Sequence, residues 1–535
     1  MTGRTFVAAC VALSLLSVLI GTVRLAMVPL DSHEIFVAGT AREMLARRDW
    51  IVPHFNGAPR LNKPPLSYWM TGAVAALAGA PPEVAAWHAR AVSVLGGVLL
   101  LGATLATGVL VFERATAAVA GALLTTSAGM FSFMHDARPD LLYAGFTAVM
   151  LAGTAWSAYG RGPRARAFVG GAGLVWLAFA CATLTKGPHV PALALLGIAM
   201  ALRRERGNWR AVRTVLRPLG GITLAAVLCL PWWVLLDARL ATIAVESTQL
   251  GGTLLAPRLS RLGDPYYLYR PLQLVLPWLP LAGFALAWWG WAGATRRALP
   301  SHAGFVLWPL LVVCLGLSLG RQYRYFYFLP LLGFLCLGAA VALRAAFTRW
   351  PRGALATLGL QAVAVVACAG WVVQHADSVR AGVLAWLAAG GVAAAVAVSR
   401  RYATPAWRVF AALCVAMAGV WPAAALTGAL WNAERYGAHA LAQTAAAALA
   451  PTTPLVALEV SGTIYVYYAG RPVQELADAS RLAGLLAESP DGQLGLVTRD
   501  TRRADLDAEY IVEELGRYRR GDGDDVLLRL APRAR

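Results

Sequence analysis

Lysine is almost missing from this chain of 535 residues. Of its 47 basic residues only Lys63 and Lys186 are lysines, and the rest are arginines. A coding bias toward arginine explains the scarcity but not the two exceptions. The lysine ammonium is a compact point charge, whereas the arginine guanidinium is a planar group with several donors. A binding site shaped for one of them therefore does not accept the other. We therefore predict that both lysines hold an anion, the alternative being chance survival.

Charged residues and cysteine pairs are scarce as well. Only 14% of the residues are charged and 58% are hydrophobic, which excludes a soluble globule. The seven cysteines lie in apolar runs and form neither a CxxC pair nor a disulfide framework. Those runs recur at about 20 residues, the length that crosses a bilayer core of about 30 Å. The composition predicts an α-helical polytopic membrane protein.

The net charge of +19 is distributed in a way that argues against nucleic acid. The arginines gather in separate short loops between apolar runs, which is the positive-inside pattern of membrane proteins. The N-terminal run lacks a small-residue cleavage site followed by a soluble domain, so it is expected to be the first span rather than a signal peptide.

Hydropathy and charge together predict about thirteen spans. Their centres fall near Leu15, Gly97, Leu123, Met150, Trp176, Leu195, Ala226, Phe284, Leu311, Leu335, Val365, Ala389 and Ala416. If the first span runs outward, the arginine clusters are cytoplasmic. The segments expected outside are then Pro29–Glu83, His135–Asp140, Thr185–His189, Asp237–Pro271, Arg321–Tyr325, Gln374–Arg380 and the tail from about Trp431.

Two outer regions are too long to be simple connections. In the first loop, residues 29–83, an apolar periodicity predicts an amphipathic helix along the membrane surface. Its apolar positions are Val37, Ala41, Met44 and Leu45. Leu66–Ala80, opened by two prolines, predicts a second helix. We assign residues 1–430, with this loop, to a transmembrane domain.

The tail, residues 431–535, is predicted to be a small α/β domain outside the membrane. Strands are expected at Leu455–Val460, Thr463–Tyr468, Leu494–Thr498 and Val526–Leu530, with a helix at Ala477–Glu488. It contains no recognisable catalytic motif, so a structural or acceptor-docking role is expected.

Charged residues from separate stretches converge on the outer rim of this topology. Asp31 and Glu34 follow the first span, Asp140 opens the fourth and Lys186 closes the fifth. Arg324 stands at the start of the tenth. Placing a charged side chain beside an apolar span costs free energy, so such residues are first interpreted as functional. A ring of solvated charges at the interface is the alternative, and it would explain any one of them. The two lysines lie in predicted outer segments, where the positive-inside rule makes basic residues rare. Their position therefore favours a functional role for them.

Carboxylates beside cations suit transfer of a group away from a phosphate. Ammonium groups neutralise charge developing on phosphate oxygens in a partly dry site. A carboxylate accepts a proton from an acceptor hydroxyl, whereas an acceptor that is itself a phosphate needs no base. The set therefore predicts chemistry on a phosphate-linked donor.

A string of first-loop motifs resembles the bacterial lipid A aminoarabinose transferases, whose wider relatives include the protein O-mannosyltransferases. The motifs are Asp31-Ser32-His33-Glu34, Ala41-Arg42-Glu43-Met44-Leu45, Asp49-Trp50-Ile51-Val52-Pro53, Asn56-Gly57 and Lys63-Pro64-Pro65-Leu66-Ser67-Tyr68-Trp69. Weaker pieces continue it through Asp140-Leu141, Thr185-Lys186-Gly187, Pro231-Trp232, Val245-Glu246, Pro277-Trp278, Tyr327-Phe328-Leu329-Pro330 and Tyr468 to Pro472. The resemblance spans most of the chain.

The resemblance implies a GT-C glycosyltransferase fold and inverting transfer from a polyprenyl-phosphate sugar. Asp31 and Asp140 match the family's two acidic residues and are the predicted catalytic pair. Lys63 matches the lysine that contacts phosphate, Lys186 the lysine after the fifth span, and Tyr327 the tyrosine of the tenth.

The predicted substrate-binding set adds Glu34, Arg324 and Glu246 to these residues. The family usually has a glutamate directly after its first acidic residue, whereas here Ser32 and His33 intervene. The family's glutamate before the first-loop lysine, which is associated with a metal, is Asn62 here. We therefore assign no metal ligand and no certain cofactor, and a divalent metal is left open as the disfavoured alternative.

Outer-loop histidines and tyrosines complete the candidates. The histidines His33, His54, His135, His189 and His375 show no close ligand spacing and are expected to be solvated. A loop carrying Tyr266, Tyr267 and Tyr269 among arginines suits either interface anchoring or lipid-phosphate binding.

The sequence thus predicts an inner-membrane glycosyltransferase with a periplasmic site. Its partners would be a polyprenyl-phosphate sugar, membrane lipids and a periplasmic acceptor, with lipid A or a related glycolipid favoured and a protein hydroxyl as the other option. A lipid or sugar transporter is the alternative, and it would need polar residues at span midpoints or inverted repeats, neither of which is evident. A non-catalytic scaffold would not need the two lysines.

Overall fold

The computed structural model describes residues 1–163, 167–241, 265–294, 302–320, 323–374, 405–427, 433–519 and 523–533. Two compact units make up the chain. The first contains Met1–Leu25, Leu61–Met70 and Arg90–Ala429, and the second contains Ala26–Arg60, Thr71–Ala89 and Leu430–Arg535. The first loop is therefore shared between the units, with most of it grouped with the C-terminal domain.

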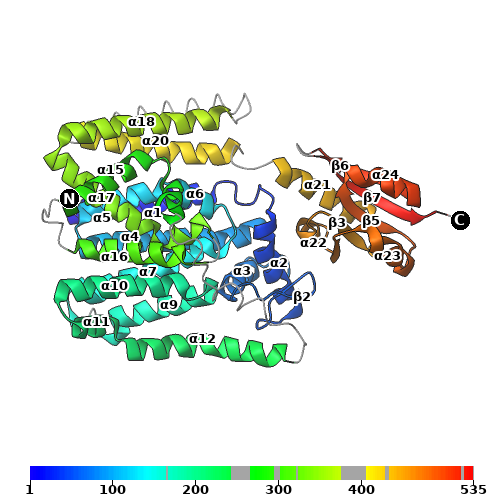
Figure 1. Ribbon diagram of the computed structural model, residues 1–535, viewed down its shortest axis with the longest axis horizontal. Coiled ribbons are helices and arrows are strands. Elements are labelled where there is room, and N and C mark those ends of the chain that lie inside the picture. Colours follow the sequence, from blue (N-terminus) through cyan, green and yellow to red (C-terminus); the bar gives the residue numbers. More distant parts are fainter. Residues whose placement is uncertain are drawn as a thin grey trace. The chain divides into compact units, whose positions relative to one another are not determined.

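The first unit is a bundle of apolar helices (Figure 1). Its helices include α1 (Gly3–Thr22), α4 (Ala86–Val111), α5 (Arg114–Thr125), α6 (Ala128–Met134), α7 (Pro139–Tyr159), η1 (Phe168–Ala172), α9 (Gly173–Lys186), α10 (His189–Arg206), α11 (Trp209–Leu216), α12 (Pro218–Leu240), α14 (Tyr266–Tyr269), η3 (Arg270–Val275), α15 (Leu279–Ala294), α16 (Ala303–Ser318), η4 (Tyr325–Leu331), α17 (Leu332–Arg349), α18 (Pro351–Gln374) and α20 (Pro405–Thr427). α7 packs along α9, α10 along α16, and α18 along α20.

Seven helices in the described part are long and apolar enough to cross a membrane, or eight if α5 and α6, bent by 55°, form one span. The protein is therefore a multi-pass membrane protein. Each predicted span centre in that part lies inside a helix, whereas Ala389 falls outside the described residues. The count of thirteen stays a prediction.

Indole N–H groups stabilise the break between α5 and α6. The Trp278 indole donates to the Thr126 hydroxyl (3.0 Å) and the Trp421 indole to the Thr126 carbonyl (2.7 Å). In an apolar core each backbone polar group needs a protein partner. Trp421 on α20 meets part of that need at the break, and Trp278, directly before α15, adds a bond to the Thr126 side chain.

The second unit carries a five-stranded sheet with strand order β4-β3-β5-β7-β6. Its strands are β3 (Leu455–Leu458), β4 (Val473–Leu476), β5 (Leu494–Arg499), β6 (Tyr510–Tyr518) and β7 (Asp525–Pro532). β3 pairs in parallel with β4 and β5, while β7 pairs antiparallel with β5 and β6. The expected α/β domain is present.

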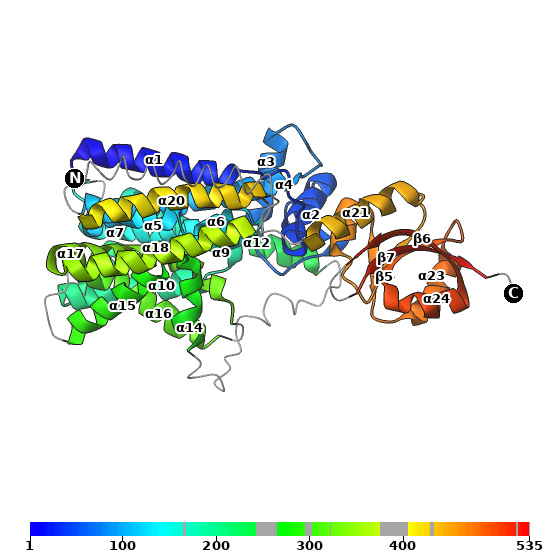
Figure 2. The same ribbon diagram turned by 90° about the horizontal axis from the view of Figure 1, so that it is seen from above.

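Alternating residues give this sheet two apolar faces, each covered by helices (Figure 2). Leu455 and Ala457 pack toward α21 (Ala433–Ala448) and α22 (Thr463–Tyr468). Val456 and Leu458 pack toward α23 (Leu482–Glu488) and α24 (Arg503–Glu509). Successive side chains in a strand point to opposite faces, so this strand is buried on both sides. Short 3-10 turns, η5 (Ala479–Arg481) and η6 (Asp500–Arg502), precede α23 and α24.

The strand predicted at Thr463–Tyr468 is wrong, because these residues form helix α22. Their β-branched and aromatic side chains suit a strand, but β3 and β4 are parallel neighbours. A parallel pair needs a crossover between its strands, usually a helix. Tertiary topology therefore overrides local propensity here. Strands β4 and β6 were not predicted.

The first-loop helix is confirmed as α2 (Ser32–Arg47), and the second as α3 (Leu66–Leu77). A hairpin of β1 (His54–Phe55) and β2 (Ala58–Pro59) lies between them. Val37, Ala41 and Met44 are buried in protein, so the apolar face of α2 does not face lipid, and its position along the membrane surface stays a prediction. The apolar face of α2 packs against α22 and β1.

Candidate active site

A buried ion pair joins two helices of the first unit. Pro139 occupies the first turn of α7, where its missing N–H costs nothing, and Asp140 follows it. Lys186 is the last residue of α9, which ends at Gly187 with φ of 111°. The Lys186 ammonium donates to Asp140 Oδ1, and the two side chains are only 5% and 6% exposed. Asp140 and Lys186, predicted from independent stretches, are thus brought together.

Aromatic rings surround the same ammonium. Lys186 Nζ lies 4.4 Å from the ring centre of Tyr327, 5.2 Å from Phe326 and 5.9 Å from Tyr143. An ammonium over ring faces within about 6 Å is attracted by roughly 0.5–2 kcal/mol per contact, the higher value applying when it is desolvated. The carboxylate and the rings compensate for burying the charge of Lys186.

The Tyr143 hydroxyl fixes the turn that follows Lys186. It donates to the Gly187 carbonyl (3.0 Å) and accepts from the Val190 N–H (3.2 Å). Those two bonds satisfy one carbonyl at the end of α9 and one N–H at the start of α10, groups that helix termini leave open. The position of Lys186 is therefore fixed from both sides of its helix end.

His189 links the second lysine to this place. It starts α10 at the predicted outer rim, and its ring centre lies 5.8 Å from that of Tyr143 and 6.5 Å from that of Tyr327. Burial, followed by the positive charges of Lys186 and Lys63, lowers the pKa of His189. Both surviving lysines therefore act on one neutral imidazole, although they lie 123 positions apart in the sequence.

A cluster of tyrosines and arginines borders the pair. The Tyr267 hydroxyl donates to the Arg324 carbonyl (3.3 Å) and accepts from the Arg324 N–H (3.2 Å). The Tyr323 ring stacks on Tyr267 with centres 5.7 Å apart. The Arg270 guanidinium lies 5.8 Å from the Tyr266 ring. Arg324 itself is exposed and precedes the turn that carries Tyr327, so its side chain is accessible to an anion.

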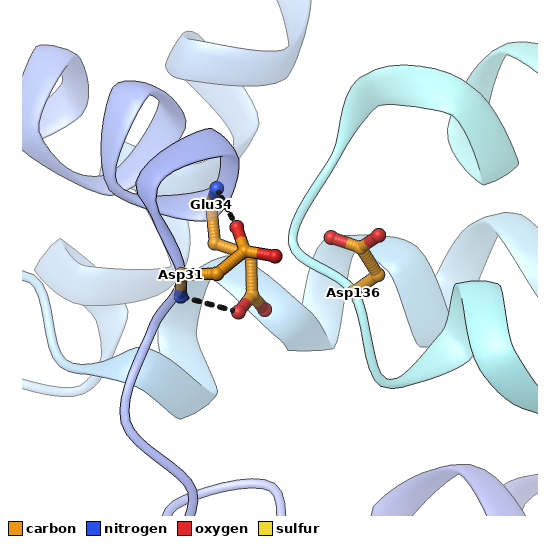
Figure 3. Close-up of side chains that lie close together, drawn as sticks. All are labelled: Asp31, Glu34 and Asp136. Atoms are coloured by element: carbon orange, nitrogen blue, oxygen red, sulfur yellow. Dashed lines mark hydrogen bonds between the residues drawn. The ribbon is translucent and has the colours of Figure 1, made fainter. Parts of the chain in front are cut away.

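Asp31 and Glu34 belong to the second unit, at the start of α2. The Glu34 N–H donates to Asp31 Oδ1 (2.8 Å) and the Asp31 N–H to Glu34 Oε2 (2.9 Å), as Figure 3 shows. This reciprocal pair is a capping box, which satisfies two open donors of the helix. Glu34 is fully buried and one oxygen of its carboxylate takes part in the cap, while its role in substrate binding stays a prediction. Asp31 is only partly buried.

From the sequence we missed Tyr143 and Phe326 at this site and expected His189 only as a solvated histidine. Tyr143 lies three residues after Asp140 on α7, so helical spacing offered a signal for it. His189 is separated from the end of α9 by Gly187 and Pro188, so no such signal existed. Phe326 gave none beyond its neighbour Tyr327. Glu246 lies outside the described residues. Because Asp31 and Asp140 lie in different units, their sharing of one cavity stays a prediction.

His54 and His135 are buried rather than solvated as predicted, and His189 is partly buried. His54 is 8% exposed and its Nδ1 lies 2.9 Å from the Val52 carbonyl oxygen. His135 is 5% exposed and contacts the carbonyl oxygens of Phe131 (2.9 Å) and Val23 (3.2 Å). Both rings satisfy backbone carbonyls near chain bends. His33 is exposed, and His375 lies outside the described residues.

The chain has the GT-C fold. The crystal structure of ArnT from Cupriavidus metallidurans bound to undecaprenyl phosphate matches with a TM-score of 0.76 and 21% identity over 98% of each chain. An Archaeoglobus fulgidus oligosaccharyltransferase matches with a TM-score of 0.50 and 11% identity over 94% of this chain and 70% of the other. At these identities the likeness establishes the fold.

The curated relatives confirm the resemblance found in the sequence. An undecaprenyl phosphate-alpha-4-amino-4-deoxy-L-arabinose arabinosyl transferase of Pseudomonas paraeruginosa is 29% identical over 64% of this chain and 63% of its own length. The same-named protein of Pseudomonas aeruginosa strain PAO1 is 29% identical over 57% and 55%. The match thus spans less than two thirds of these relatives. No family model matches the chain.

Proposed function

We propose that the protein is an inner-membrane glycosyltransferase that moves a sugar from a polyprenyl-phosphate donor to a periplasmic acceptor. The buried pair of Lys186 and Asp140, with the ring of Tyr327 4.4 Å from the ammonium, is the observation that carries this proposal. The positive charge of Lys63 acts on the neighbouring His189. The relatives' names point to undecaprenyl phosphate-linked 4-amino-4-deoxy-L-arabinose as the donor. Lipid A or a related glycolipid is the favoured acceptor.

In the proposed reaction the acceptor oxygen attacks the anomeric carbon and the bond from that carbon to the phosphate oxygen breaks. The anomeric configuration inverts, and polyprenyl phosphate leaves. Lys186 and Lys63 neutralise the charge that grows on the phosphate oxygens. Asp31, which is accessible, takes the proton if the acceptor is a hydroxyl. Asp140 holds the Lys186 ammonium in place, so we assign it a positioning role.

The placement of the charges disfavours the transporter alternative. Asp140 is the second residue of α7 and Lys186 the last residue of α9. Both therefore stand at helix ends that the sequence topology assigns to the outer rim, whereas substrate sites of secondary transporters lie near the bilayer midplane. Nothing in the comparisons supports a transporter.

The test is transfer by the purified protein in vesicles that contain undecaprenyl phosphate-linked aminoarabinose and lipid A. We expect lipid A to gain the mass of the sugar and free undecaprenyl phosphate to accumulate, both measured by mass spectrometry. Lys186→Met should abolish the product, and Arg204→Met, which removes an exposed arginine of α10, should not. A hydroxyl-containing peptide tests a protein acceptor. Movement of the donor across the vesicle without any product would contradict the proposal.

A further inference from the structure

Three contacts tie the first loop to the C-terminal domain within the second unit. The Leu30 N–H donates to the Tyr468 hydroxyl (2.6 Å). The Arg42 guanidinium donates to the Tyr467 carbonyl (2.9 Å). The Asn56 amide pairs with the backbone of Val473. These contacts join residues more than 400 positions apart, and each combines a side chain with a backbone group.

The Tyr468 contact lies next to the candidate base. Leu30 is fully buried and directly precedes Asp31, the N-cap of α2. A buried N–H that loses its partner costs about 1–3 kcal/mol, so this bond fixes the chain where it enters the helix. The ring of Tyr468 is itself held between His439 (4.3 Å) and Tyr467 (4.9 Å). Packing of the Tyr468 ring therefore fixes the position of its hydroxyl next to the Leu30 N–H.

Asn56 completes the edge of the sheet. β4 is an edge strand, and edge strands leave backbone donors and acceptors open. Asn56 Nδ2 donates to the Val473 carbonyl (2.8 Å), and its Oδ1 accepts from the Val473 N–H (3.1 Å). One side-chain amide therefore takes the place of a paired strand residue. Asn56 has φ of 56°, a conformation that asparagine tolerates better than most residues.

Arg42 fixes the middle of α2 to the same helix, α22. Its guanidinium donates to the carbonyls of Tyr467 (2.9 Å) and Val466 (3.3 Å), which lie at the C-terminal end of α22. It also lies 4.6 Å from the centre of the Tyr467 ring. Cations are favoured at helix C-termini, where carbonyls are open. The start, the middle and the following hairpin of the loop are therefore all anchored to one domain.

We propose that the C-terminal domain is a template that holds the first loop, and that Tyr468 is the positioning residue for Asp31. The proposal rests on the proposed function for the role of Asp31, but the anchoring itself does not depend on it. Tyr468 acts through the Leu30 amide and touches no reacting atom. The domain then contributes to turnover without any catalytic residue of its own.

The test compares Tyr468→Phe with Tyr436→Phe in the full-length protein. Tyr468→Phe removes only the hydroxyl and keeps the packed ring. Tyr436 lies on α21 in the same domain and is exposed, so its variant controls for loss of a tyrosine hydroxyl. Hydrogen–deuterium exchange of residues 28–36 and transfer kinetics are measured on both.

We expect Tyr468→Phe to speed exchange of the Leu30 amide at least about fivefold, since the amide loses the Tyr468 hydroxyl as its acceptor. We also expect kcat to fall by about three- to tenfold with KM unchanged, the range that a net hydrogen-bond energy of 0.5–1.5 kcal/mol allows. Asn56→Gly, which keeps the positive φ but removes the edge contact, should speed exchange in the β1–β2 hairpin. Tyr436→Phe should match the wild type in every measurement.

Unchanged exchange at Leu30 in Tyr468→Phe would overturn the anchoring. Faster exchange with wild-type kcat would overturn the positioning role. A wild-type protein that transfers no sugar to any acceptor would refute the proposed function and with it the role assigned to Asp31, while the exchange data would still decide whether the domain holds the loop. The two failures are therefore distinguishable.

Discussion

Replacing Lys186 with methionine should destabilise the bundle by leaving the Asp140 carboxylate buried and unpaired. Both side chains of the pair are no more than 6% exposed, so water cannot replace the lost partner. Removing one member of such a pair costs about 3–5 kcal/mol. Methionine has nearly the length of the lysine stem, so the aromatic pocket stays filled and the change reports on charge.

Protonation limits this penalty. An isolated aspartic acid in water is protonated at pH 7 at a cost of about 4 kcal/mol, and the cost falls by about 1.4 kcal/mol for each pH unit. The Lys186→Met variant should therefore be destabilised by at most about 4 kcal/mol at pH 7 and by about 1.5 kcal/mol at pH 5. The stability difference from the wild type should shrink as the pH falls.

A double-mutant cycle measures the coupling directly. The wild type, Lys186→Met, Asp140→Asn and the double variant are unfolded in mixed micelles at pH 7 and pH 5. We expect the double variant to be less destabilised than the sum of the single variants by about 2 kcal/mol or more, because it leaves no unpaired charge. Arg204→Met should stay within about 0.5 kcal/mol of the wild type. Additive effects that do not depend on pH would refute the buried ion pair.

Four further outcomes are expected. Lys63→Arg should lower transfer activity although the charge is kept, because a planar fork does not fit a site built for an ammonium; an equally active variant would mean that this lysine is incidental. Asp31→Asn should lower kcat more than donor affinity, measured by kinetics and by donor binding, and the reverse pattern would remove Asp31 as base. His189→Phe should alter donor phosphate binding more than stability, compared by titration and thermal unfolding. A reporter fused after Arg535 should be active only outside the cytoplasm, and a cytoplasmic signal would invert the proposed topology.

Much of the fold was predictable because its signals are local. An apolar run near 20 residues satisfies its own backbone as a helix, so the spans follow from composition alone. The α2 helix followed from its periodicity. The failure at Thr463–Tyr468 has a physical cause, since a six-residue segment cannot specify a helix when the reason for it is the parallel pairing of β3 with β4.

The sequence allowed several residues of the candidate site to be predicted, but not the contacts that they make with one another. Lys186 and Asp140 stand out as charges beside apolar runs, yet their contact depends on how α7 packs along α9. Likewise the sequence gives no sign that Phe326 would face an ammonium. We also missed that the Glu34 carboxylate completes the capping box of α2, although its role at the substrate stays a prediction.

The surroundings of Lys186 give a steric reason for a lysine in a chain that otherwise uses arginine. Among the described residues the ammonium has one carboxylate partner, and the rings of Tyr327, Phe326 and Tyr143 lie within 6 Å. A guanidinium presents five donors and needs several acceptors when buried. Asp140 alone cannot supply them, and rings accept such donors only weakly. An ammonium, which is smaller and can turn its three donors, is satisfied by one carboxylate and the ring faces while keeping a proton for an incoming phosphate. The same reasoning makes Lys186→Arg a charge-conserving change that leaves buried donors without acceptors.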